Sequence, residues 1–295
     1  MAAPKKIALG LGSGGARGYA HIGVIRWIEE QGLEISTIAG SSMGALVGGM
    51  YAAGQLDEFT EWATAIRKTD IVSMVDLVFG QPGFVGGDRV MAALQEFVGD
   101  RTIEDLPIPY TAVASDVVRE KEIWFTKGPL FEAIRASISI PLFFVPVEKN
   151  GRELLDGGIL EPVPVAPTLD QDVDLIVAVN LAGPADAEWV AAHPIETPEP
   201  EERGKMRGLI DRFLDGVERR VVGGDGDQPS MLRVATDVVD AMQGAIGRMK
   251  LAAHPPDVEI AMPRNAAQVL EFDRAYELIE LGRIAAEEQL GPFLD

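Results

Sequence analysis

The chain has 295 residues, of which 47% are hydrophobic and 24% charged, a composition typical of a globular protein that excludes wholesale disorder. Its 46 acidic and 26 basic side chains give a formal net charge of -20, which argues against nucleic acid and strongly anionic bilayers as partners. There are no cysteines, so disulfides, thiolate catalysis and Cys-based zinc sites are excluded.

The first predicted element is a buried strand at residues 7–9, which runs into a glycine-rich segment at residues 10–18. A helix follows, because apolar side chains recur with the i, i+3, i+4, i+7 spacing of one helical face from His21 to Ile28. A short buried strand at residues 35–39 comes next. The apolar stripe from Leu46 to Tyr51 then predicts a second helix.

The same alternation continues through the middle of the chain. Residues 69–87 are unusually apolar and are interrupted by glycine and proline. The elements expected after them are a helix at 88–97, strands at 110–114 and 122–125, a helix at 131–137 and a strand at 175–179. This rhythm predicts an α/β fold with a mostly parallel central sheet that is covered by helices on both faces.

The composition changes after Gly183. Residues 184–204 are rich in Pro, Glu and Ala, and we expect an exposed connection there. Helices at 206–221 and 231–251, a strand at 257–261 and a helix at 273–290 are predicted to follow. We expect one core at 6–183, an acidic Pro/Gly-rich insertion at 184–228 whose amphipathic helix is a lid or linker, and a C-terminal part at 229–295 that completes the same domain.

The turn between residues 35–39 and the following helix carries the most informative motif. Gly40-Ser41-Ser42-Met43-Gly44 matches G-x-S-x-G, with Ser42 at its centre. A serine at a strand-to-helix turn is held on a tight bend with its hydroxyl exposed, and flanking glycines permit that bend. The helix N-terminus behind it favours the negative charge that develops during acyl transfer. Ser42 is therefore predicted to be a nucleophile.

A serine nucleophile needs a base, and the three histidines are weak candidates. His21 lies on the apolar stripe of the first helix, which predicts a core or capping role. His193 and His254 each precede a proline and are expected in loops. His254 nevertheless stays open as the base of an α/β-hydrolase arrangement in the order Ser, acid, His.

Asp156, in Asp156-Gly157-Gly158, is the better candidate. A desolvated carboxylate within hydrogen-bond reach of Ser42 could accept the serine proton and later return it to the leaving alcohol. The two glycines would let another part of the backbone approach the carboxylate closely.

The glycine-rich segment allows two functions. Gly10-x-Gly12-x-x-Gly15 between a strand and a helix fits a dinucleotide-binding fingerprint, with Glu34 as its acidic partner, and would suit a non-catalytic nucleotide-binding regulatory protein. Alternatively, the N–H groups of Gly14 and Gly15 form an oxyanion hole, and Arg17 anchors the loop or favours negative charge near it. The G-x-S-x-G motif one βα unit later favours the oxyanion hole.

These features together resemble the patatin-like phospholipase family, particularly its compact bacterial members, over residues 6–181. The blocks that carry the resemblance are Gly14-Gly15-Ala16-Arg17-Gly18, Gly40-Ser41-Ser42-Met43-Gly44, Ala136-Ser137-Ile138-Ser139-Ile140-Pro141 and Asp156-Gly157-Gly158. The resemblance implies a three-layer α/β/α patatin-like fold, a Ser42–Asp156 dyad, an oxyanion loop at Gly14 and Gly15, and hydrolysis of lipid acyl esters without a metal. It also implies that the Ser-Ile-Pro block, with Ser139 and Pro141, lies beside the active site.

The sequence thus predicts a serine lipid acyl hydrolase that cleaves phospholipid or lysophospholipid esters through an acyl-enzyme. An acyltransferase and a His-dependent esterase are the alternatives. No cofactor and no metal are expected. The predicted partners are a lipid or acyl-ester substrate and a membrane surface that the protein contacts transiently. The sequence shows no signal peptide and no membrane-spanning run, so the expected location is cytoplasmic, with a peripheral membrane location as the alternative. The 69–87 segment and Phe143-Phe144 are candidates for lining an acyl tunnel.

Overall fold

The computed structural model describes residues 4–66, 86–141, 143–169, 171–197 and 231–294. Two sequence-based predictions lie outside these residues. They are the helix expected at 206–221 and, apart from its last two residues, the apolar segment 69–87.

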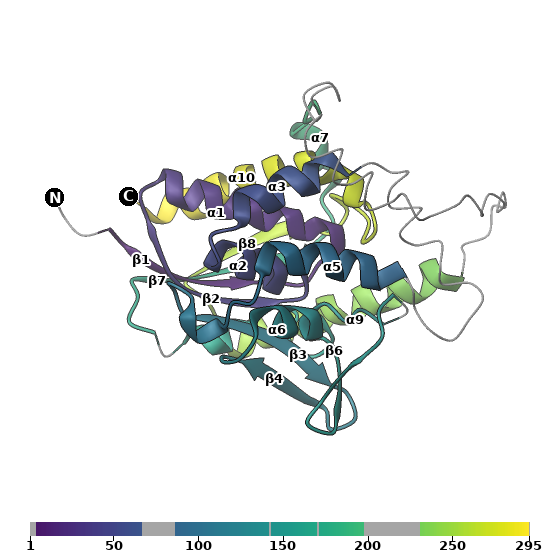
Figure 1. The fold of residues 1–295 in the computed structure, drawn as a ribbon. Coiled ribbons are helices and arrows are strands. Elements are labelled where there is room, and N and C mark those ends of the chain that lie inside the picture. Colours follow the sequence, from purple (N-terminus) through teal and green to yellow (C-terminus); the bar gives the residue numbers. More distant parts are fainter. Residues whose placement is uncertain (1–3, 67–85, 142, 170, 198–230, 295) are drawn as a thin grey trace.

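A mixed sheet of eight strands forms the centre of the described chain (Figure 1). Five parallel strands lie side by side in the order β3-β2-β1-β7-β8, while β4, β5 and β6 pair antiparallel around β3. The strands are β1 (Lys6–Leu11), β2 (Glu34–Ser41), β3 (Tyr110–Asp116), β4 (Lys121–Phe125), β5 (Val147–Lys149), β6 (Arg152–Asp156), β7 (Leu175–Gly183) and β8 (Val258–Pro263). The predicted, mostly parallel sheet is therefore confirmed.

Helices cover both faces of this sheet. The helices are α1 (Ala20–Glu30), α2 (Met43–Ala52), α3 (Leu56–Ala65), α5 (Gly86–Val98), α6 (Leu130–Ser137), α7 (Ala187–Ala192), α9 (Met231–Ala253) and α10 (Ala275–Leu290). Along β7, Val177 and Val179 belong to the large core that includes α1 and α10, whereas Ala178 packs with Leu251 of α9. Alternate residues of one strand thus face two helical layers, as in a three-layer α/β/α fold (Figure 1).

Close backbone contacts fix how the layers meet. A Cβ on Gly23 of α1 would lie 1.9 Å from the carbonyl oxygen of Ile279 in α10. A Cβ on Gly44 of α2 would lie 2.0 Å from the carbonyl oxygen of Leu11, at the end of β1. Only glycine fits at such distances, so these two positions set the spacing of α1 against α10 and of α2 against β1.

The segment 184–204, expected to be an exposed connection, contains the short helix α7 (Ala187–Ala192), none of whose residues is buried. The carboxylate of Asp186 caps this helix by accepting the N–H of Trp189 at 2.8 Å. The indole of Trp189 also donates to Glu288 of α10 at 2.7 Å. A short helix with an N-cap and a hydrogen bond to a neighbouring helix can form despite the Pro-rich composition around it.

Among the helices in the described part of the chain, none is long and apolar enough to cross a bilayer.

Candidate active site

The edge of β3 brings two distant parts of the chain together. β2 pairs with β3 as far as Ser41, which lies opposite Val113. On the same edge, the next residue of β3, Ala114, pairs with Asp156 at the end of β6, because β4 occupies the other edge. The turn after β2 and the end of β6 therefore meet, and the Ser42 hydroxyl donates a hydrogen bond to Oδ2 of Asp156 at 2.5 Å.

Two glycines allow this meeting. A Cβ on Gly157 would lie 2.1 Å from the carbonyl oxygen of Val113, and one on Gly158 would lie 2.3 Å from Oγ of Ser13. The predicted close approach of another backbone is confirmed at Gly157. At Gly158 the close neighbour is a side chain.

Ser42 is held in a conformation that is uncommon outside glycine, with φ 56° and ψ -125°. Its N–H donates to Oγ of Ser137 at 2.9 Å, and the Ser137 hydroxyl donates in turn to the carbonyl oxygen of Val113 at 2.5 Å. The turn is buried, with Ser42 1% exposed. Ser137 thus connects the strained turn to β3, a role that the sequence analysis did not assign to it.

Asp156 is buried beside two donors. Its Oδ2 accepts the Ser42 hydroxyl, and its Oδ1 accepts the N–H of Gly158 at 2.8 Å. Burial raises the pKa of Asp156 to about 7, against the opposing effect of these two hydrogen bonds. A carboxylate with this pKa is a far better proton acceptor at neutral pH than an ordinary aspartate.

Two N–H groups of the glycine-rich loop after β1 have no hydrogen-bond acceptor in the backbone of the described residues. The N–H groups of Gly12, Ser13 and Ala16 donate to backbone carbonyls elsewhere in the fold, at 2.8–3.0 Å. Within the described residues, neither Gly14 nor Gly15 has such an acceptor for its N–H. Both glycines line the cavity that contains Ser42. Two such donors beside a serine hydroxyl are what an oxyanion hole requires.

The side chain of Arg17 holds this loop through hydrogen bonds to backbone carbonyls. Its guanidinium is buried and donates from Nε to the carbonyl oxygen of Gly14 at 3.2 Å and from Nη1 to that of Arg264 at 2.8 Å. Its Nη2 forms an ion pair with Asp240 of α9. Of the two roles considered for Arg17, the contacts fit anchoring, because its charge is already matched by Asp240.

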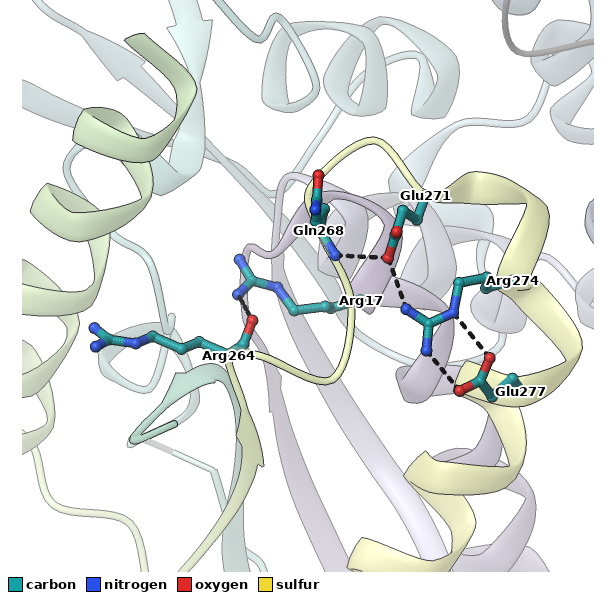
Figure 2. A network of polar contacts seen from close by, with 6 residues as sticks. All are labelled: Arg17, Arg264, Gln268, Glu271, Arg274 and Glu277. Atoms are coloured by element: carbon teal, nitrogen blue, oxygen red, sulfur yellow. Dashed lines mark hydrogen bonds and ion pairs between the residues drawn. The ribbon is translucent and has the colours of Figure 1, made fainter. Parts of the chain in front are cut away.

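The connection between β8 and α10 passes against the same loop. Figure 2 shows Arg17 at the carbonyl of Arg264, and further along the connection Arg274 between Glu271 and Glu277. Glu271 also accepts the N–H of Gln268 at 2.9 Å. These contacts stiffen the segment whose Val269 carbonyl accepts the N–H of Ala16 at 2.8 Å.

The cavity that contains Ser42 and Asp156 is lined by both apolar and polar residues. Its empty space, including the opening to solvent, is about 510 Å³. The lining residues besides Ser42, Asp156, Gly14 and Gly15 are Ser13, Ile140, Pro141, Phe143, Thr236, Val239, Asp240, Gln243 and Val269. Of the two phenylalanines expected to line an acyl tunnel, Phe143 lines this cavity, whereas Phe144 packs against the core and lies beside Arg135.

The Ser-Ile-Pro block lies where the resemblance implied. The carbonyl of Ser139 accepts the N–H of Asp156 at 3.0 Å, and Pro141 lines the cavity. Both residues are direct neighbours of the dyad.

No histidine is among the described residues that line the cavity. The core position predicted for His21 is confirmed, since its Nε2 lies 2.7 Å from the carbonyl oxygen of Gly12 and burial lowers its pKa to about 4. His193 lies next to Glu288, and His254 follows the C-terminus of α9. This geometry disfavours a His-dependent esterase.

The dinucleotide fingerprint is also disfavoured. Gly10 lies inside β1, and Glu34 pairs with Lys6 at the start of β1 and β2. The glycine-rich loop leaves the opposite end of β1, so Glu34 is too far along the strands to contact a ribose bound there.

In the described part of the chain, no three His, Asp or Glu side chains are grouped as metal ligands.

Two residues of α9 contact the glycine-rich loop, and the sequence analysis does not include them. Asp240 pairs with Arg17, and Gln243 accepts the hydroxyl of Ser13 at 3.2 Å. They follow the glycine-rich loop by more than 200 residues, and no motif marks them.

Residues 9–169 match the family model described as "Patatin-like phospholipase". An uncharacterized NTE family protein of Mycobacterium tuberculosis is 40% identical, over 98% of this chain and 92% of that protein. A lysophospholipase of Saccharomyces cerevisiae is 34% identical over 61% of this chain and 11% of its own length, and the neuropathy target esterase of Drosophila melanogaster is 30% identical over 62% and 13%. Among solved structures, VipD from Legionella pneumophila matches 97% of this chain and 66% of that chain, with TM-score 0.48 and 13% identity.

Proposed function

The chain belongs to the patatin-like phospholipase family and is a lipid ester hydrolase, and we propose that its reaction proceeds through a Ser42–Asp156 dyad. The observation that carries this proposal is the hydrogen bond from the Ser42 hydroxyl to a buried carboxylate with a pKa of about 7. A serine and its proton acceptor, already in contact at the bottom of a cavity, need no rearrangement to begin acyl transfer.

In the first half of the reaction, Ser42 Oγ attacks the acyl carbonyl carbon while Asp156 accepts the serine proton. The carbonyl oxygen becomes an oxyanion, which the N–H groups of Gly14 and Gly15 stabilise. When the tetrahedral intermediate collapses, the bond to the alcohol oxygen breaks and Asp156 returns the proton to that alcohol. An ester between Ser42 and the fatty acid remains.

In the second half, water occupies the place of the departed alcohol. The water oxygen attacks the acyl-enzyme carbonyl carbon while Asp156 accepts a proton from this water. The second oxyanion uses the same two N–H groups, and its collapse expels Ser42 Oγ, which recovers the proton from Asp156. The products are a fatty acid and the free enzyme. If an alcohol replaced water in this step, the same site would perform acyl transfer.

We propose a phospholipid or lysophospholipid as the substrate. Ile140, Pro141 and Phe143 offer an apolar wall for an acyl chain, while Thr236 and Gln243 offer polar groups to the rest of the molecule. Relatives named lysophospholipase support this class. Because such lipids reside in membranes or micelles, we also propose a transient contact with a lipid surface.

We further propose that residues 229–295 belong to the same domain as residues 6–183. In support, β8 extends the central sheet beside β7, and α10 packs on α1.

The test uses nitrophenyl esters of increasing acyl length. The wild-type rate should rise with chain length, and Ser42→Ala and Asp156→Asn should each reduce kcat by at least about 1,000-fold. Ser41→Ala is the matched control, because the neighbouring Ser41 hydroxyl is buried and has no hydrogen-bond partner in the described structure. Full activity of Ser42→Ala would disprove the dyad. If His254→Ala lost activity while Asp156→Asn kept it, the base would be His254 and not Asp156.

A further inference from the structure

Helix α9 forms one wall of the active site although it lies outside the region matched by the family model, which ends at residue 169. Its residues Thr236, Val239, Asp240 and Gln243 line the cavity. Two of them also contact the glycine-rich loop, Asp240 through Arg17 and Gln243 through Ser13. The proposed oxyanion hole is thus held by an element from the other end of the chain.

The peptide between Gly14 and Gly15 is the part of the loop that matters. The carbonyl of Gly14 and the N–H of Gly15 belong to one planar trans peptide, so they point in opposite directions. Nε of Arg17 donates to this carbonyl at 3.2 Å. By fixing the carbonyl on one side, Arg17 fixes the Gly15 N–H on the other.

The two glycines leave this peptide less restricted sterically than others, so its orientation depends on its hydrogen bonds. Neither residue has the Cβ that normally restricts rotation of a peptide plane. Gly15 already has φ 55°, in the left-handed region. The orientation of the Gly15 N–H therefore depends on what holds the Gly14 carbonyl.

Arg17 itself is held by Asp240. The guanidinium is 1% exposed, and a buried cation needs an anionic partner. Within the described residues, Asp240 is the carboxylate that forms an ion pair with it. The remaining partners of Arg17, the carbonyls of Gly14 and Arg264, carry no net charge.

We propose that Asp240 is a positioning residue of the reaction, which acts through Arg17 to keep the Gly14–Gly15 peptide oriented for the oxyanion. The inference rests on the proposed function, because it assumes that the Gly15 N–H stabilises an oxyanion formed at Ser42. Turnover would then depend on the position of α9 against the glycine-rich loop. No direct contact between Asp240 and the reacting atoms is required.

The experiment measures kcat and KM of Asp240→Asn on a soluble nitrophenyl ester, with active sites counted by a fluorophosphonate that labels Ser42. We expect kcat to fall about 10- to 100-fold while KM stays within about threefold, because a displaced donor weakens binding of the transition state more than that of the substrate. Asp237→Asn, the same charge change one turn earlier on an exposed position of α9, should leave both constants near wild type.

A double-mutant cycle separates positioning from folding. Arg17→Gln removes the buried cation, so Arg17→Gln/Asp240→Asn leaves no unpaired charge even if Asp240→Asn alone folds poorly. If Asp240 acts through Arg17, the double variant should match the kcat of Arg17→Gln within about twofold. Asp240→Glu, which keeps the charge, should recover most of the activity.

Two results would overturn the inference. One is a wild-type kcat for folded Asp240→Asn, and the other is a further tenfold fall when Asp240→Asn is added to Arg17→Gln. A failure of the proposed function would appear elsewhere, as full activity of Ser42→Ala or failure of the fluorophosphonate to label Ser42.

Discussion

At the scale of single residues, the proposed mechanism depends on a carboxyl group that burial has made unusually basic. Burial favours the neutral acid, so Asp156 carries a proton below its pKa of about 7 and is a carboxylate above it. Only the carboxylate can accept the proton of Ser42. In the proposed mechanism, the hydrogen bond at 2.5 Å therefore serves proton transfer in one protonation state and not in the other.

We predict that kcat/KM on a soluble ester rises about tenfold per pH unit below pH 7 and levels off above it. The measurement is a rate profile from about pH 5 to pH 9, with Ser42→Ala as the blank for spontaneous hydrolysis. Burial also raises the pKa of Glu161 to about 7, so Glu161→Gln is the necessary control. A profile that stays flat between pH 5 and pH 8, or one that Glu161→Gln abolishes, would contradict the assignment to Asp156.

The residues proposed to perform the chemistry can be found in the sequence more readily than the residues that hold them in place. Ser42 and Asp156 stand in short motifs, because a nucleophile on a turn and a carboxylate before two glycines constrain their immediate neighbours. Ser137 and Asp240 act on atoms far away in the sequence. Ser137 accepts the N–H of Ser42 only because α6 is placed beside β3, and such a contact leaves no local pattern.

At the scale of elements, periodicity predicts the parallel strands and most of the helices, but the predictions include neither α3 nor the β5–β6 hairpin that carries Asp156. Its strands have three and five residues and are partly exposed, so they show no buried run. A usable signal was nevertheless present. Asn150 and Gly151 have φ 52° and 68°, and Asn-Gly between short strands is the preferred two-residue hairpin turn.

The contact of α1 with α10 supplies a prediction about stability. Gly23→Ala places a methyl group 1.9 Å from the carbonyl oxygen of Ile279, a backbone atom that cannot rotate away. The two helices must separate, and we expect urea unfolding to give a free energy lower by at least about 1–3 kcal/mol.

Gly247→Ala in α9 is the control for Gly23→Ala. There the nearest atom to the added methyl group, Cβ of Pro162, lies at an ordinary 3.6 Å. Since alanine favours a helix over glycine by about 1 kcal/mol, this variant should be as stable as wild type or more so. Equal stability of Gly23→Ala and wild type would show that the helices do not meet as described.

At the scale of the whole molecule, the site draws on both ends of the chain. The nucleophile and the glycine-rich loop come from the first 45 residues, whereas Asp240, Gln243 and Val269 come from the last 60. The composition predicts a globular chain, and the alternation of strands and helices predicts the class of the fold. Neither predicts which C-terminal side chains reach the loop, because that depends on how α9 crosses β7 and not on a repeating pattern.

The net charge of -20 leads to a last prediction, about the lipid surface from which substrate is drawn. A strongly acidic protein is repelled by anionic vesicles, and the repulsion reaches about 30 Å at 0.01 M salt but only about 8 Å at 0.15 M. Hydrolysis of vesicles rich in anionic lipid should therefore be slower than that of zwitterionic vesicles at low salt. The difference should shrink as salt is added, while the rate on a soluble uncharged ester stays constant. Faster hydrolysis of the anionic vesicles at low salt would mean that a local basic surface, and not the total charge, governs the approach to lipid.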